Sequence, residues 1–174
     1  MILAVDPGVK NLGWALGEEA YFSKGLGFRA QADVFTCTTT EEQFNRKMDE
    51  ENFQCLEFFE RLFLVYNITH VAWELPPAFG GMGQQTRILS NIVVLKTLAW
   101  QNKCFFSSFT PIKMKSVLTG NSKASKEEIR QEVIRRLPEW DDSDRPKKER
   151  YAPDLFDAIG IAMVAIELND WRRF

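Results

Sequence analysis

The sequence predicts an α/β fold in which helices flank a mixed β-sheet. Two observations carry this prediction: short apolar segments typical of strands come first, and from about residue 40 onward helical and strand-like segments alternate. Hydrophobic residues make up 45% of the 174 residues, too many for a disordered chain. The length suits one domain with its own core, which we place at residues 1–174.

The first strands are predicted near the N-terminus. Residues 2–5 form a short apolar run that ends at Asp6 and is followed by Pro7 and Gly8, which predicts a buried strand and then a turn. Residues 11–16 are expected to pair with it as a hairpin, and residues 33–38 to form a third strand.

Helices and strands are then expected to alternate. Apolar residues recur near the 3.6-residue period over about residues 40–66, which predicts a long helix. Residues 70–74 form a β-like run that ends in Glu74, residues 86–100 predict an apolar helix, and residues 104–109 a further strand.

The last third of the chain carries two helix-start signals. Ser125 and Glu128 have the spacing of a capping box, which predicts a helix from there to about Leu137. Pro153 suits the first position of a helix, and the apolar pattern over residues 154–168 continues it. Residues 140–150 are charged and are predicted to form a loop of unassigned role.

Charge is unevenly distributed along the chain. The net charge of −2 and the pI of about 5.6 argue mildly against a nucleic-acid binder. Residues 75–126, however, contain no acid, which predicts a positive surface; the alternative is that apolar segments are simply poor in charge. The seven bases of this window are Arg87, Lys96, Lys103, Lys113, Lys115, Lys123 and Lys126.

The cysteine content and the apolar segments favour a protein of the cytoplasm, or of the host cytoplasm if the gene is viral. Three widely spaced cysteines indicate neither a disulfide framework nor a zinc site. No apolar run is long enough to cross a bilayer, and the apolar start is too short for a signal peptide, so no membrane partner is expected.

Four acids stand apart from the others. Asp6 and Glu74 end apolar strands, whereas Asp154 and Asp157 share one face at the start of an apolar helix. Carboxylates in such positions are costly without a counter-charge, and Mg²⁺ prefers oxygen ligands, so together they predict a divalent-metal site. Taken singly, Asp6 is equally well explained as a turn residue and Glu74 as a rim charge. For Asp154, the role of an ordinary helix-start acid is the commoner one.

At this point the sequence resembles the RuvC-type Holliday junction resolvases of the RNase H-like superfamily. The resemblance rests on residues 2–8 with Asn11 and Gly13, on residues 71–74, and on the acid pair Asp154 and Asp157 followed by an apolar helix. The order and spacing of these motifs extend over nearly the whole chain. The acidic pI and the Pro- and Gly-rich loop after Glu74 depart from the family pattern.

The resemblance implies an RNase H-like sheet and a set of roles. Asp6, Glu74, Asp154 and Asp157 would be catalytic ligands of Mg²⁺, for which Mn²⁺ can substitute. Two lysines would act near the scissile phosphate, and an aromatic residue would wedge into the junction. Our candidates for these roles and for further DNA contacts are Lys115, with Lys113 as its competitor, Lys126, Phe79, Lys123 and Arg87.

The alternatives to these roles remain open at this stage. The lysines are otherwise ordinary surface residues, and Phe79 otherwise packs on the core. The resemblance also implies a homodimer, for which the helix over residues 88–100 is either the interface or plain core.

The predicted function is metal-dependent cleavage of four-way DNA junctions. A flap-cleaving or RNA-processing nuclease of the same fold shares the carboxylates and is therefore the main alternative. A non-catalytic binder of branched DNA is disfavoured because clustered acids repel phosphate. An actin-like phosphotransferase is disfavoured by the short chain, which lacks a duplicated second half.

Overall fold

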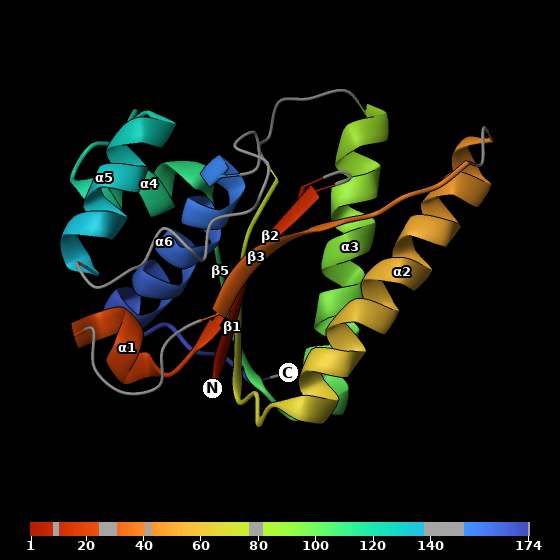
Figure 1. The fold of residues 1–174 in the computed structure, drawn as a ribbon, viewed down its shortest axis with the longest axis horizontal. Coiled ribbons are helices and arrows are strands. Elements are labelled where there is room, and N and C mark those ends of the chain that lie inside the picture. The colour runs from red at the N-terminus through yellow and green to blue at the C-terminus, as the bar shows by residue number, and fades with distance from the viewer. Residues whose placement is uncertain (9–10, 25–30, 41–42, 77–81, 138–151, 174) are drawn as a thin grey trace.

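The structure is a computed structural model that describes residues 1–8, 11–24, 31–40, 43–76, 82–137 and 152–173. Phe79 and residues 140–150 lie outside these ranges. Within them the chain forms five strands and six helices (Figure 1). None of the described helices is both long and apolar enough to cross a bilayer.

The strands form one mixed sheet in the order β3-β2-β1-β4-β5. Antiparallel pairing joins β1 (Ile2–Asp6) to β2 (Asn11–Gly17), and β2 to β3 (Gln31–Thr36). Parallel pairing joins β1 to β4 (His70–Glu74), and β4 to β5 (Phe105–Phe109). The carboxyl ends of β1, β4 and β5 therefore lie along one edge of the sheet.

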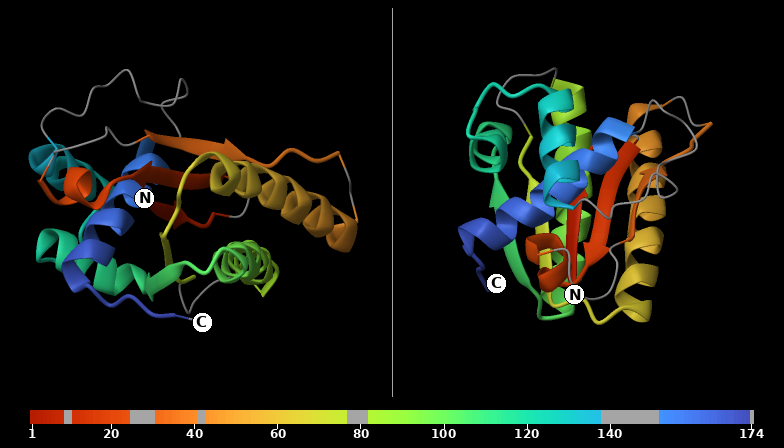
Figure 2. Two further views of the ribbon diagram at one scale, coloured as in Figure 1. Left: turned by 90° about the horizontal axis from the view of Figure 1, so that it is seen from below. Right: turned by 60° about the vertical axis from the view of Figure 1, so that its left-hand side comes forward.

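Helices cover both faces of the sheet, as Figures 1 and 2 show. On one face α6 lies across β1 and β2 and is flanked by α1, α4 and α5; on the other face lie α2 and α3. The helices are α1 (Glu19–Lys24), α2 (Phe44–Val65), α3 (Met82–Gln101), α4 (Pro111–Thr119), α5 (Lys126–Arg136) and α6 (Ala152–Leu168).

Alternation along β1 divides its side chains between two cores. Ile2 and Ala4 pack in the core on the α6 side, whereas Leu3 and Val5 pack in the core beneath α2 and α3. The period of two directs the next residue, Asp6, to the α6 side. The same alternation along β4 places Glu74 on that side as well.

The predicted mixed sheet flanked by helices is confirmed, and the strand at residues 70–74 has the predicted bounds. Several other bounds were wrong: β3 lies at residues 31–36, α2 begins at residue 44, and α3 begins at residue 82. Helices α1 and α4 were not predicted. The start of α4 is fixed by Thr110, whose hydroxyl accepts the N–H of Lys113, and by Pro111 at the first helical turn.

Candidate metal centre

Three carboxylates from the two ends of the sequence meet at the carboxyl end of β1. Oxygen atoms of Asp6, Asp154 and Asp157 all lie within 4.8 Å of one another. Asp6 ends β1, whereas Asp154 and Asp157 lie in the first turns of α6, three residues apart and on one face. The structure thus brings three of the four predicted site acids together.

Gly13 explains how α6 comes so close to the sheet. It lies opposite Asp6 in the β1–β2 ladder, and a Cβ at this position would be 2.1 Å from the carbonyl oxygen of Asp154. Any side chain would therefore push away the start of α6 and its carboxylates. The glycine of the N-terminal motif is a packing requirement of the site.

Glu74 lies at the periphery of this group. It ends β4, beside β1, but its carboxylate is not among the three that share the 4.8 Å cluster. It is nevertheless electrostatically coupled to them, because its charge contributes to the raised pKa of Asp6. Burial, helped by the negative charge of Asp157, raises the pKa of Glu74 itself to about 7.

Asp6 and Asp157 are held where ionisation is unfavourable. Burial raises the pKa of Asp6 well above its usual range, and the charges of Asp157, Glu74 and Asp154 raise it further. Burial also raises the pKa of Asp157, against the opposing charge of Lys126. A group of buried acids that repel one another is stabilised by a cation, and an all-oxygen set suits Mg²⁺ or Mn²⁺.

In the part of the chain that the structure describes, Lys126 is the cation that contacts the acid pair. Its Nζ lies 3.2 Å from Oδ1 of Asp154 and 3.2 Å from Oδ2 of Asp157. Burial lowers the pKa of Lys126, but the two carboxylates outweigh this effect and raise it above its usual value. The predicted capping box fixes its backbone, because Ser125 accepts the N–H of Glu128 while the Glu128 carboxylate accepts the N–H of Ser125.

Lys115 lies near the same site on α4. Its positive charge lowers the pKa of both Glu74 and Asp157. Lys113 is on the same helix with its side chain exposed, and its N–H caps the helix through the Thr110 hydroxyl. The electrostatic coupling therefore favours Lys115 over Lys113 as the second lysine of the site.

Arg87 is not brought to the carboxylates. Its Nε donates to Oε2 of Glu51 at 2.8 Å, and its Nη2 also contacts that carboxylate. The side chains of Arg87 and Glu51 are only 14% and 2% exposed, so the pair joins α3 to α2 as part of the interior. The predicted DNA contact of Arg87 is therefore replaced by this interior ion pair.

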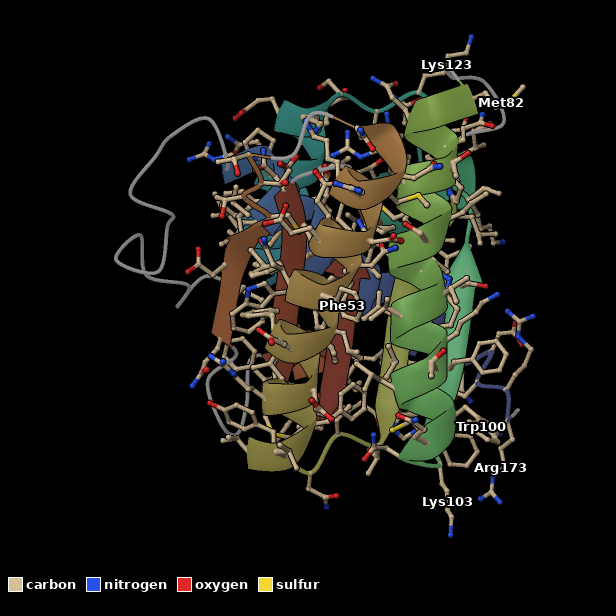
Figure 3. All side chains as sticks on the ribbon, turned by 90° about the vertical axis from the view of Figure 1, so that its right-hand side faces the viewer. Phe53, Met82, Trp100, Lys103, Lys123 and Arg173 are labelled. Atoms are coloured by element: carbon tan, nitrogen blue, oxygen red, sulfur yellow. The ribbon has the colours of Figure 1, made fainter. Side chains whose placement is uncertain are left out.

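The acid-free window does not form one positive face. Lys123 and Lys103 lie at opposite ends of the molecule in Figure 3, because the 20 residues of α3 separate the two ends. Lys96 lies over the ring of Trp73, with Nζ 5.8 Å from the ring centre. Of the lysines in this window, Lys126 contacts the acids and Lys115 is electrostatically coupled to them. Lys123 lies three residues before Lys126 in the sequence.

Sequence reasoning missed one polar residue beside the site. Asn91 on α3 is 1% exposed, and its Nδ2 donates to the carbonyl oxygen of Gly8, two residues after Asp6, at 3.2 Å. The sequence signal that could have identified Asn91 is an amide side chain within an otherwise apolar stretch of the predicted helix.

The sheet order, the helices on both faces and the acids at the ends of β1 and β4 and the start of α6 define the RNase H-like class of nuclease folds. Within this class, the chain belongs to the RuvC family. It is 30% identical over 167 residues to the crossover junction endodeoxyribonuclease RuvC of Aliarcobacter butzleri, covering 93% of this chain and 95% of the relative. No family model matches the sequence.

Solved structures support the fold. RuvC of Thermus thermophilus in complex with a Holliday junction substrate has a TM-score of 0.69 and 19% identity, covering 99% of this chain and 98% of the other. The yeast mitochondrial Holliday junction resolvase Ydc2 has a TM-score of 0.65 and 18% identity, covering 95% of this chain and 77% of the other.

Proposed function

We propose that this chain is a structure-selective endonuclease that resolves four-way DNA junctions by metal-dependent phosphodiester hydrolysis. The observation that carries the proposal is the group of Asp6, Asp154 and Asp157, three coupled carboxylates within 4.8 Å at the carboxyl edge of the sheet. The relative in Aliarcobacter butzleri bears the name of a crossover junction endodeoxyribonuclease, which points to branched DNA as the substrate.

The acids are assigned the metal-binding role. Asp6, Asp154 and Asp157 would hold Mg²⁺, or Mn²⁺ in its place, with Glu74 completing the set from β4. When bound, two such ions would supply activation of a water molecule and stabilisation of the leaving oxygen in phosphodiester cleavage. The protein contributes buried oxygen ligands fixed by a strand end and a helix start, and this arrangement holds the ligands in place before DNA arrives.

The lysines are assigned to the phosphate. Lys126 stands at the first turn of α5, where the positive end of the helix dipole favours anions, and its side chain is 57% exposed. Lys115 approaches the same acids from α4. With Lys113 and Lys123 they would form the DNA-contacting edge, and Phe79 remains the proposed junction wedge on the basis of the family resemblance alone.

We also propose a homodimer that associates through α3. The outer face of this helix exposes Met82, Leu89, Val93 and Trp100, each between 48% and 85%, and an apolar face of this kind suits a protein interface. Val93→Glu should convert dimer to monomer in sedimentation analysis. Ile112→Glu, which changes an equally exposed apolar residue on α4, should leave the dimer intact.

The cytoplasm is the proposed compartment. Cys37, Cys55 and Cys104 are free and buried, which suits a reducing setting.

Cleavage of a labelled immobile four-way junction tests the function. Paired, symmetric cuts are expected with Mg²⁺ and with Mn²⁺ but not with EDTA, in the presence of excess duplex competitor. Asp6→Asn should lower the cleavage rate by at least about a hundredfold with the junction Kd unchanged, because it removes a ligand of the metal and no DNA contact. Asp170→Asn, at an exposed acid after α6, is the matched control.

Substrate competition separates the alternatives. Preferential cutting of a flap or an RNA–DNA hybrid would keep the metal centre and overturn the junction assignment. Binding without cutting of any nucleic acid would overturn the enzymatic assignment. Lys126→Ala should slow cleavage with the fold intact, whereas Lys123→Ala should have a smaller effect because Lys123 contacts neither acid.

A further inference from the structure

Asn91 is a buried amide on a helix face that otherwise packs apolar residues. Its neighbours on the inner face of α3 include Ile92, Leu95 and Leu98, all buried. A buried amide costs free energy unless its hydrogen bonds are made. Its Nδ2 donates to the backbone carbonyl of Gly8, 83 residues away in sequence.

The turn that receives this hydrogen bond begins at Asp6. The N–H of Gly8 donates to the carbonyl oxygen of Asp6 at 3.0 Å, which folds the chain back immediately after β1. A Cβ at Gly8 would lie 1.9 Å from the carbonyl oxygen of Asn11, so the turn is packed against the start of β2. One side of the turn is thus fixed by β2, and α3 holds it through Asn91.

We propose that Asn91 is a positioning residue for Asp6: its amide fixes the turn at Gly8 and so sets the direction of the Asp6 carboxylate toward Asp154 and Asp157. This role rests on the metal-dependent function proposed above. The partners of metal ligands typically contribute tenfold or more to metal affinity, and Asn91, which acts through one turn of backbone, is expected to contribute about tenfold.

Ser90 provides a matched control on the preceding position. Its hydroxyl donates to Oδ1 of Asn52 on α2 at 2.8 Å rather than to the turn after β1. A change at Ser90 therefore perturbs the packing of α3 on α2 without removing the hydrogen bond to Gly8. Asn91→Leu removes that donor while keeping a side chain of similar size.

A labelling scheme reports on the Gly8 carbonyl alone. Glycine is followed by valine only at positions 8 and 9 of this sequence, so carbonyl-¹³C glycine with ¹⁵N valine gives a single correlated peak. Asn91→Leu should move this peak in the carbon dimension, raise the Kd for Mn²⁺ about tenfold and lower kcat on the junction with KM unchanged. Ser90→Ala should leave all four quantities near the wild-type values.

The outcomes separate the two proposals. A shifted Gly8 peak with unchanged Mn²⁺ affinity and kcat overturns the positioning role, and so does an equal loss in Ser90→Ala. If Asn91→Leu does not fold, Asn91→Ser, which is smaller and keeps a polar group, is measured in the same way. If both Asn91→Leu and Asp6→Asn leave the affinity for Mn²⁺ unchanged, the metal centre itself is overturned. If Asp6→Asn weakens Mn²⁺ binding and Asn91→Leu does not, only the role of Asn91 is overturned.

Discussion

Glu74→Gln should stabilise the metal-free protein above neutral pH and have little effect at acidic pH. In the folded protein, burial and the charge of Asp157 raise the pKa of Glu74 from 4.5 to about 7, whereas the unfolded chain has the ordinary value. The folded state therefore binds this proton more tightly than the unfolded state does. As a result, the free energy of unfolding falls as the pH rises from 4.5 to about 7 and stays low above it.

The size of the effect follows from the pKa difference. The interval from 4.5 to about 7 corresponds to about 3 kcal/mol at about 1.4 kcal/mol per unit. Glutamine carries no charge and does not incur this cost. The gain of Glu74→Gln should therefore grow from less than about 1 kcal/mol at pH 5 to about 3 kcal/mol at pH 8, while cleavage activity is lost with the ligand.

Urea unfolding in EDTA at several pH values between 5 and 8 measures this gain. Asp6, whose pKa is also raised, adds its own pH dependence, and part of that dependence comes from the charge of Glu74. The difference between variant and wild type therefore measures the removal of the Glu74 charge together with its effect on Asp6. Glu60→Gln, at an exposed position on α2, controls for the loss of one carboxylate. A difference that stays constant across this pH range would refute the raised pKa of Glu74.

Three further predictions test the packing around the site. Gly13→Ala should lower the free energy of unfolding by about 1–3 kcal/mol or more and abolish cleavage, because its methyl group would meet the backbone of Asp154. A variant with the melting temperature and cleavage rate of the wild type would disprove this close approach. Ser125→Ala should lower the free energy of unfolding, measured by thermal melting, by about 1 kcal/mol because the capping box is lost. An unchanged stability would show that the cap is dispensable. Arg87→Ala should lower the free energy of unfolding, measured in urea, by about 3–5 kcal/mol, because it leaves the buried Glu51 carboxylate unpaired. The double variant Arg87→Met, Glu51→Leu should recover most of this stability. If it does not, the loss in Arg87→Ala comes from packing alone.

Local signals made much of the fold predictable. The strand at residues 70–74 and the helix after Ser125 were found because an apolar run and a capping box are complete within a few residues. The start of α4 carried equally local signals in Thr110 and Pro111, and these were overlooked. Helix α1 spans only six residues, too few for a periodic pattern to stand out.

The site was predictable as a set of acids but not as a geometry. Strand ends and a helix start identify Asp6, Glu74, Asp154 and Asp157 from the sequence, but only packing shows that Glu74 stands outside the closest three. An ion pair between two distant helices could likewise not be predicted from the sequence. Arg87 and Glu51 are 36 residues apart, and their contact exists only because α3 packs against α2.

The site also has an order of assembly built into the chain. Asp6 is synthesised well before Asp154 and Asp157, which lie on α6, whose buried residues fill the core on their side of the sheet. A nascent chain that has completed β1, β4 and α3 still lacks two of the three clustered carboxylates. The folding step that closes this core is therefore also the step that brings the three carboxylates together.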